Sequence, residues 1–136
     1  MHMINDVLIL KSLADENRLR LMALLRTREL FVCQLMAVTG LSQPLISRSL
    51  ALLERAGLLQ SRRQGKHVFY RISPAMPSLA RAALGAMDDA VPGSPLARDR
   101  ASLELFCRRF HGAGTCDMAV VRRFMEYREK SQYKEA

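Results

Sequence analysis

The sequence has no tryptophan and few aromatic residues of any kind, which make up 6% of its 136 residues. Leu, Ala, Val and Met must therefore fill the core. With 49% apolar residues, the chain can bury such a core without disulfides or a structural metal. A long apolar run is also missing, because Asp6 and Lys11 interrupt the N-terminal segment and polar residues interrupt the uncharged stretch 30–47. We expect no signal peptide and no membrane span, and hence a cytoplasmic protein.

Cysteine is scarce as well, with three residues in the chain, Cys33, Cys107 and Cys116. An odd number of thiols in a reducing compartment argues against structural disulfides and favours metal, redox or core roles. The sequence also shows no phosphate-cradling glycine loop, no Cys–His–acid arrangement and no paired carboxylates. We therefore expect that the protein is not an enzyme.

Positive charge is what the sequence has in excess, with a formal net charge of +8 and a pI of about 10.1. The excess peaks in residues 42–73, where the one acid is Glu54 and the six bases are Arg48, Arg55, Arg62, Arg63, Lys66 and Arg71. Such a window can be an ordinary solvated face. A strongly basic small protein nevertheless makes nucleic acid the leading class of partner.

Helical signals lead into this basic window. Apolar residues at helical spacing predict helices over residues 3–13, from near 15 to 28, and over 32–38. Gly40 is a good C-terminal signal for the third of these. Ser42 as an N-cap, Pro44 in the first turn and Gly57 at the end predict a fourth helix. Two short helices joined by a glycine-containing turn form a helix-turn-helix pattern.

A basic hairpin is predicted directly after this motif, with strands over 58–60 and 68–72 and Gly65 in the turn between them. A hairpin in that place is a wing. Further helices are predicted over residues 74–91, 97–111 and 116–130. The expected fold is mainly α with a small β-hairpin: a winged helix-turn-helix domain over residues 1–91 and a helical C-terminal extension over residues 92–136.

Four segments carry a more specific pattern: ELFVCQLM (29–36), SQPLISRSLALL (42–53), AGLL (56–59) and YRIS (70–73). The pattern resembles the arsenical-resistance repressors of the ArsR/SmtB family. The resemblance covers about residues 8–80 and leaves residues 97–136 outside. It implies a winged-helix homodimer that represses its own resistance operon and leaves DNA when a thiophilic ion binds. It also implies dimer contacts from residues 3–13 and 75–90.

Eight side chains are expected to contact DNA. In the fourth helix, Gln43 can pair with adenine, Arg48 with guanine or phosphate, and Ser47 with a base edge or phosphate. Ser42 can both cap the helix and contact a phosphate. Many relatives have His where this chain has Ser49, which implies a missing or altered base contact. On the wing, the expected phosphate contacts are Arg62, Arg63, Lys66 and His67, for which ordinary surface charge is the alternative.

The thiol pattern departs from that of the best-known relatives. They read ELCVCDLC where this chain reads ELFVCQLM, so that Phe31 and Met36 stand in place of two cysteines and Cys33 alone remains. A methionine thioether is a neutral, weak donor and cannot replace a thiolate for As(III). The intrahelical thiolate site of those relatives is therefore not available to this chain.

The tail supplies two further cysteines, Cys107 and Cys116, where one predicted helix ends and the next begins. Their surroundings are electropositive because of Arg108, Arg109 and His111, and Thr115 is a candidate cap in front of Cys116. Together with the resemblance, this chemistry makes Cys33, Cys107 and Cys116 the expected ligands of As(III) or Sb(III) as inducer, with no organic cofactor. Cys107 and Cys116 alone would instead suit a methylated trivalent arsenical.

Other roles for the thiols are open at this point. Cys107 continues an apolar helical stripe, and free cysteines are among the most buried residues, so Cys107 and Cys33 can instead be core. A bridge between two thiols would make the chain a redox or reactive-sulfur sensor, as in some winged-helix relatives. Zinc is not expected, because residues 75–90 lack histidine and the chain's histidines are scattered: His2, His67 and His111.

Overall fold

A computed structural model of the chain describes residues 2–87, 92–109 and 118–135, and the side chains of residues 5–87, 92–109 and 118–130. The helices are α1 (His2–Leu13), α2 (Glu16–Leu25), α3 (Val32–Thr39), α4 (Gln43–Arg55), α5 (Ser78–Ala86), α6 (Pro95–Arg109) and α7 (Met118–Glu135). The strands are β1 (Leu30–Phe31), β2 (Leu59–Gln64) and β3 (His67–Ile72). Among these residues, no helix has both the length and the apolar character needed to cross a bilayer.

Helix α2 and the two helices of the helix-turn-helix, α3 and α4, have ends that follow local signals in the sequence. Asp15 caps α2 by accepting a hydrogen bond from the Arg18 amide at 3.0 Å. Gly40 ends α3 with φ of 78°, a left-handed conformation that costs glycine least. Ser42 caps α4, and Pro44 lies in its first turn. The predicted mainly helical, winged helix-turn-helix fold is confirmed.

The hairpin is also confirmed, and it belongs to a three-stranded antiparallel sheet of order β1–β3–β2. Its strands are longer than predicted and pair as far as Gln64 and His67, which leaves Gly65 and Lys66 as a two-residue turn. Gly65 has φ of 61°, as the first position of such a turn requires. We did not predict β1, because a strand of two residues shows no alternation of apolar and polar positions.

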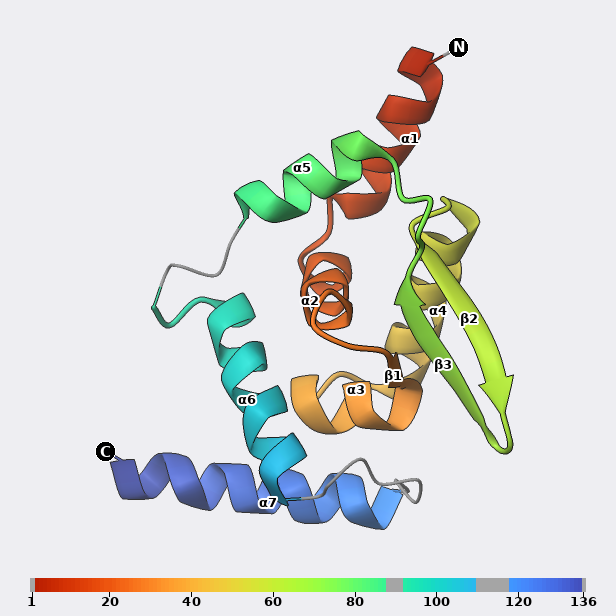
Figure 1. Cartoon of the computed structure of the whole chain (residues 1–136). Helices are drawn as coiled ribbons and strands as arrows, with labels where there is room; N and C mark the ends of the chain where they lie inside the picture. Colours follow the sequence, from red (N-terminus) through yellow and green to blue (C-terminus); the bar gives the residue numbers. More distant parts are fainter. Residues whose placement is uncertain (1, 88–91, 110–117, 136) are drawn as a thin grey trace.

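Helix α2 lies in the middle of the molecule and packs against α4, α5 and α6, with α1 at one end (Figure 1). Leu21 and Met22 of α2 are fully buried, and they share one apolar cluster with Leu35 of α3 and with Ile46 and Leu50 of α4. Burying a side chain of this size stabilises a fold by about 1.5–3 kcal/mol. This cluster fixes α4 and leaves its opposite face outward.

The C-terminal segment joins the same cluster through two helices. Helix α6 packs against α2 and α3, and α7 packs against α3 (Figure 1). The rings of Phe106 and Phe124 meet edge to face, with centroids 5.1 Å apart, and both side chains are buried. The two predicted tail helices are therefore confirmed as α6 and α7 over the described residues. Residues 110, 111, 116 and 117 of that prediction lie outside them, and the division of the chain at residue 91 remains a prediction.

The predicted helix over residues 74–91 is wrong at its start. Helix α5 begins at Ser78, after an extended Pro77 with φ of −58° and ψ of 148°. Before it, the Met76 amide donates to the Ser73 carbonyl at 3.0 Å and closes a turn. Proline disfavours helical backbone in the residue that precedes it, so Pro77 delays the helix. Residues 88–91, the predicted C-terminal end, lie outside the described residues.

The left-handed Gly40 provides a test of the helix-turn-helix turn. We expect Gly40→Ala to lower the free energy of unfolding by about 1–2 kcal/mol, because a Cβ is strained at positive φ. Gly85→Ala is the matched control: Gly85 lies inside α5 with open space around it, and alanine there should be neutral or stabilising. Equal urea midpoints for the two variants would contradict the assignment of strain to Gly40.

Candidate DNA-binding surface and thiol site

The N-terminal half of α4 presents a polar face. Ser42 Oγ accepts a hydrogen bond from the Leu45 amide at 3.4 Å and so caps the helix. Gln43 is exposed and donates from Nε2 to Ser47 Oγ at 2.8 Å, and Arg48 is exposed one position further. Four predicted DNA contacts therefore lie within two turns of one helix end, where short polar groups and a cation can enter a major groove.

Position 49 differs from these four. Ser49 is 7% exposed and belongs to the inner side of α4, with Ile46, Leu50 and Leu53. A side chain buried at this level offers little to a DNA base. The predicted loss of a base contact at Ser49 therefore concerns a side chain that packs inward in this structure.

The hairpin carries the second group of predicted contacts. Arg62, Arg63 and Lys66 are exposed, and His67 is half-buried. The strand register places Arg63 opposite Val68, next to the two-residue turn that contains Lys66. Two cations at the tip of a projecting hairpin can reach phosphates beside a groove that α4 occupies.

The hairpin packs on the body of the protein through contacts that the sequence did not predict. Arg62 forms an ion pair with Glu29 and lies over the Phe69 ring, 4.7 Å from its centroid. His67 stacks on Phe31 of β1, with ring centroids 4.3 Å apart. Glu29 and Phe31 lie far from the hairpin in sequence, so only the three-dimensional pairing of β1 with β3 reveals these contacts. Arg62 and His67 thus also hold the wing in place.

Comparison with known proteins agrees with this geometry. Residues 15–61 match the family described as bacterial regulatory protein, arsR family. The arsenic resistance transcriptional regulator ArsR1 of Pseudomonas putida is 45% identical over 84 residues, or 61% of this chain and 66% of that protein. The solved structure of HlyU from Vibrio cholerae is 32% identical with a TM-score of 0.57, covering 63% of this chain and 90% of that one. The chain belongs to the ArsR family.

A second curated relative, the arsenical resistance operon repressor of Escherichia coli, is 52% identical over 73 residues, or 53% of this chain and 62% of that protein. The chain thus spans less than two thirds of the length of these two curated relatives. The matched family is one of helix-turn-helix transcription regulators rather than enzymes. The family match ends at residue 61, before α6 and α7.

The two described cysteines lie on helices that pack together. Cys33 is in the first turn of α3 and Cys107 is near the end of α6, and both are half-buried at the edge of the core. Neither residue is fully buried. Cys116, Thr115 and His111 lie outside the described residues. Within the described part of the chain, no three His, Cys, Asp or Glu side chains are grouped to hold a metal ion.

Cys107 has a cationic neighbour that the sequence did not suggest. Arg28, in the α2–β1 connection, donates from Nη1 to Cys107 Sγ at 3.0 Å. Cys107 also lines a surface hollow of about 590 Å³, together with Arg100, Arg108 and the carboxylate of Glu104. The thiolate is the form that binds metalloids and attacks electrophiles, and the Arg28 guanidinium lies against the sulfur at which it would form.

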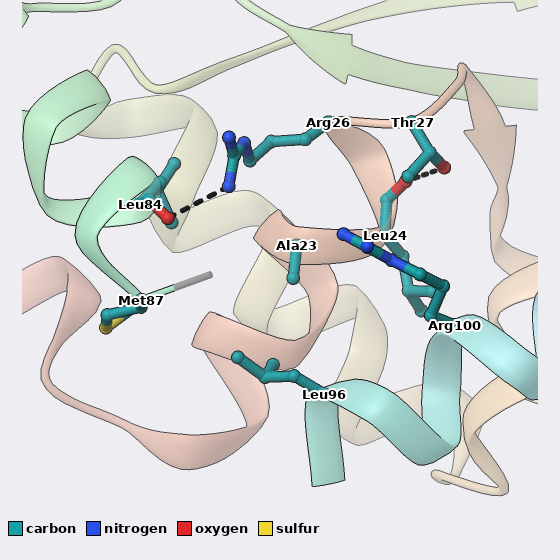
Figure 2. Close-up of a pocket in the computed structure, with 8 residues that line it drawn as sticks. All are labelled: Ala23, Leu24, Arg26, Thr27, Leu84, Met87, Leu96 and Arg100. Carbon is teal, nitrogen blue, oxygen red and sulfur yellow. Dashed lines mark hydrogen bonds between the residues drawn. The ribbon is translucent and has the colours of Figure 1, made fainter. Parts of the chain in front are cut away.

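A different cavity, between α2, α5 and α6, is closed to such chemistry (Figure 2). Its volume is about 20 Å³, enough for about one water molecule. Arg26 crosses it to donate to the Leu84 carbonyl at 2.9 Å, and Thr27 bonds the Leu24 carbonyl at 2.6 Å (Figure 2). This cavity therefore joins α5 to α2 and is too small for an organic inducer.

Proposed function

We propose that this protein is a cytoplasmic, homodimeric winged-helix repressor that leaves its operator when a trivalent arsenical or antimonial binds its cysteine thiolates. The observation that carries the proposal is the pairing of an exposed polar helix start with a basic wing in a chain of the ArsR family. Two relatives that are named for arsenic resistance direct the choice of inducer.

In this proposal α4 enters the major groove. Gln43, Ser47 and Arg48 meet base edges or phosphates, and Ser42 contacts a phosphate while it caps the helix. The wing lies along the neighbouring backbone and offers Arg62, Arg63, Lys66 and His67. Arg62 and His67 also pack on Glu29 and Phe31. We therefore assign the larger share of the phosphate contact to Arg63 and Lys66, at the tip of the hairpin.

Wing variants test the DNA-binding part. Arg63→Ala and Lys66→Ala should each weaken binding to a duplex from the protein's own promoter, and each should reduce the slope of log affinity against log salt by about 0.9. Fluorescence anisotropy over a series of salt concentrations measures both. Arg98→Ala removes one exposed charge from α6 and should leave the slope unchanged. An equal loss of slope in Arg98→Ala would show that total charge, not the wing, governs binding.

The proposed inducer site draws on all three cysteines. Trivalent arsenic prefers three sulfur ligands, and Cys33 and Cys107 come from two helices, α3 and α6, that pack against each other. Cys116 follows α6 in the chain and would supply the third sulfur from the same subunit or from the partner. If Cys107 and Cys116 act without Cys33, the fitting inducer is a methylated trivalent arsenical.

The proposed dimer interface centres on α1. Three of its apolar side chains are exposed, Val7 at 45%, Leu8 at 53% and Leu10 at 49%. Helix α5 packs beside α1 and adds Leu79 and Ala83, which are half-buried. An exposed apolar face of this kind is stabilised by burial against a second copy, and a dimer would bring two copies of α4 to two operator half-sites.

A second candidate is a thiol redox sensor. A solved structure titled reduced HlyU from Vibrio cholerae is 28% identical and covers 81% of this chain, and Arg28 lies against the Cys107 sulfur here. In this alternative, hydrogen peroxide would be reduced to water while two thiols form a disulfide, and DNA would be released. Release by peroxide, reversal by a reductant and no response to arsenite would support it. Mass spectrometry would identify the linked pair.

A further inference from the structure

The C-terminal end of α3 is gripped by side chains from outside the helix-turn-helix. The Val38 carbonyl accepts hydrogen bonds from Ser102 Oγ of α6 and from Arg128 Nη1 of α7, both at 2.8 Å. The Thr39 carbonyl accepts one from Arg20 Nη2 of α2 at 3.1 Å. The last carbonyls of a helix have no partner within it and carry its negative dipole end, so these two guanidinium groups match the charge they meet.

The gripping side chains are themselves tied together. Arg128 Nη1 lies 3.2 Å from Ser102 Oγ. Arg20 binds both carboxylate oxygens of Asp99, from Nε at 2.7 Å and from Nη2 at 2.9 Å. Asp99 is 4% exposed and Ser102 is 5% exposed, so both α6 groups are removed from competing water. Charge-assisted, bidentate hydrogen bonds in such surroundings fix geometry more strongly than exposed ones do.

This network ends at the turn between α3 and α4, which sets the direction of α4. Gly40 and Leu41 follow the gripped carbonyls directly, and Ser42 then caps α4. Arg128 also approaches the turn itself, since its Nη2 atom lies 3.5 Å from where a Cβ on Gly40 would stand. Only Gly40, Leu41 and Ser42 lie between these carbonyls and α4. A movement of the Val38 and Thr39 carbonyls would therefore pass to α4 through a very short turn.

We propose that Ser102 and Arg128, together with Asp99 acting through Arg20, are positioning residues for DNA recognition. They hold the end of α3, and hence the direction in which α4 leaves the turn. Helix α6 carries Asp99, Ser102 and Cys107. A ligand at the thiol therefore acts on a helix that also holds the end of α3. The proposal rests on the proposed DNA binding and adds to it the residues that connect the tail to the DNA-binding surface.

The test compares two arginines of α7. Arg128→Ala removes the hydrogen bonds to Val38 and Ser102, and Arg122→Ala removes the same charge from an exposed side chain that donates to the Met118 carbonyl of its own helix. We expect Arg128→Ala to weaken promoter binding about tenfold with an unchanged salt slope, and Arg122→Ala to stay within about twofold of wild type. Hydrogen exchange at the Gly40 and Leu41 amides should accelerate in Arg128→Ala alone. Arg128→Lys, which keeps a cationic donor, should recover part of the affinity.

Every result of this comparison either supports or contradicts the proposed role of Arg128. Circular dichroism and a urea titration confirm that Arg128→Ala is folded at the assay temperature, and Ser102→Ala gives a milder second variant with the same expected direction. Wild-type affinity in both variants would overturn the proposal. A salt slope reduced by about one in Arg128→Ala would also overturn it, because Arg128 would then be a phosphate contact. If the wild type itself fails to bind promoter DNA, the proposed function fails first, and this role fails with it.

Discussion

Cys107→Ser is expected to bind promoter DNA as tightly as the wild type and to stay bound when arsenite is added. The wild type should lose about 5–150-fold in DNA affinity under the same conditions, the range typical of allosteric coupling. The reason is local, since Cys107 presents a half-buried sulfur beside Arg28 on a helix that packs against the helix-turn-helix. Serine keeps the size of the side chain and removes the soft ligand. Anisotropy of a labelled promoter duplex during an arsenite titration measures the difference.

Cys33→Ser and Cys116→Ser separate the forms of the inducer site. A site of three sulfurs predicts that either change also abolishes release by arsenite. A site of Cys107 and Cys116 predicts that Cys33→Ser still releases DNA with a methylated trivalent arsenical. A wild-type response to arsenite in Cys107→Ser would refute the assignment of this residue.

Asp99→Ala is expected to lower the free energy of unfolding by about 3–5 kcal/mol, since it leaves a largely buried Arg20 without its carboxylate. The side chains of Arg20 and Asp99 are 16% and 6% exposed, so water can replace the lost partner only in part. Their hydrogen bond also raises the pKa of the Arg20 guanidinium, so this side chain is charged at neutral pH. Urea unfolding followed by circular dichroism gives the difference.

Glu104→Ala is the matched control for this prediction. Glu104 lies on the same helix and pairs with Arg108 at 3.9 Å, but their side chains are 63% and 75% exposed. Ion pairs in such exposed positions contribute between about 0 and 1 kcal/mol. If Asp99→Ala and Glu104→Ala unfold at the same urea concentration, Arg20 and Asp99 do not form the buried anchor described above.

Local sequence signals predicted the DNA-binding part well, because caps and turns are local. Ser42, Pro44 and Gly40 define the ends of α3 and α4 through their own backbone preferences, and Gly65 defines the hairpin turn in the same way. The predicted start of α5 was wrong for an equally local reason. The prediction followed the helical pattern from Pro74 and gave too little weight to Pro77, which disfavours helical backbone in the residue before it.

Contacts between residues far apart in the sequence could not be predicted from such local signals. Arg20 and Asp99 are 79 residues apart, and Arg128 and Val38 are 90 apart, so no pattern along the chain connects them. The position of Arg28 beside Cys107 has the same origin. The three-cysteine site remains a prediction, since it includes Cys116.

X-ray absorption at the arsenic edge, on full-length protein loaded with arsenite and freed of excess, tests the central claim most directly. The account predicts arsenic bonded to three sulfur atoms in the wild type, and a loss of sulfur neighbours in Cys107→Ser. Arsenic that keeps only oxygen neighbours, or that is washed away from the wild-type protein, would contradict it.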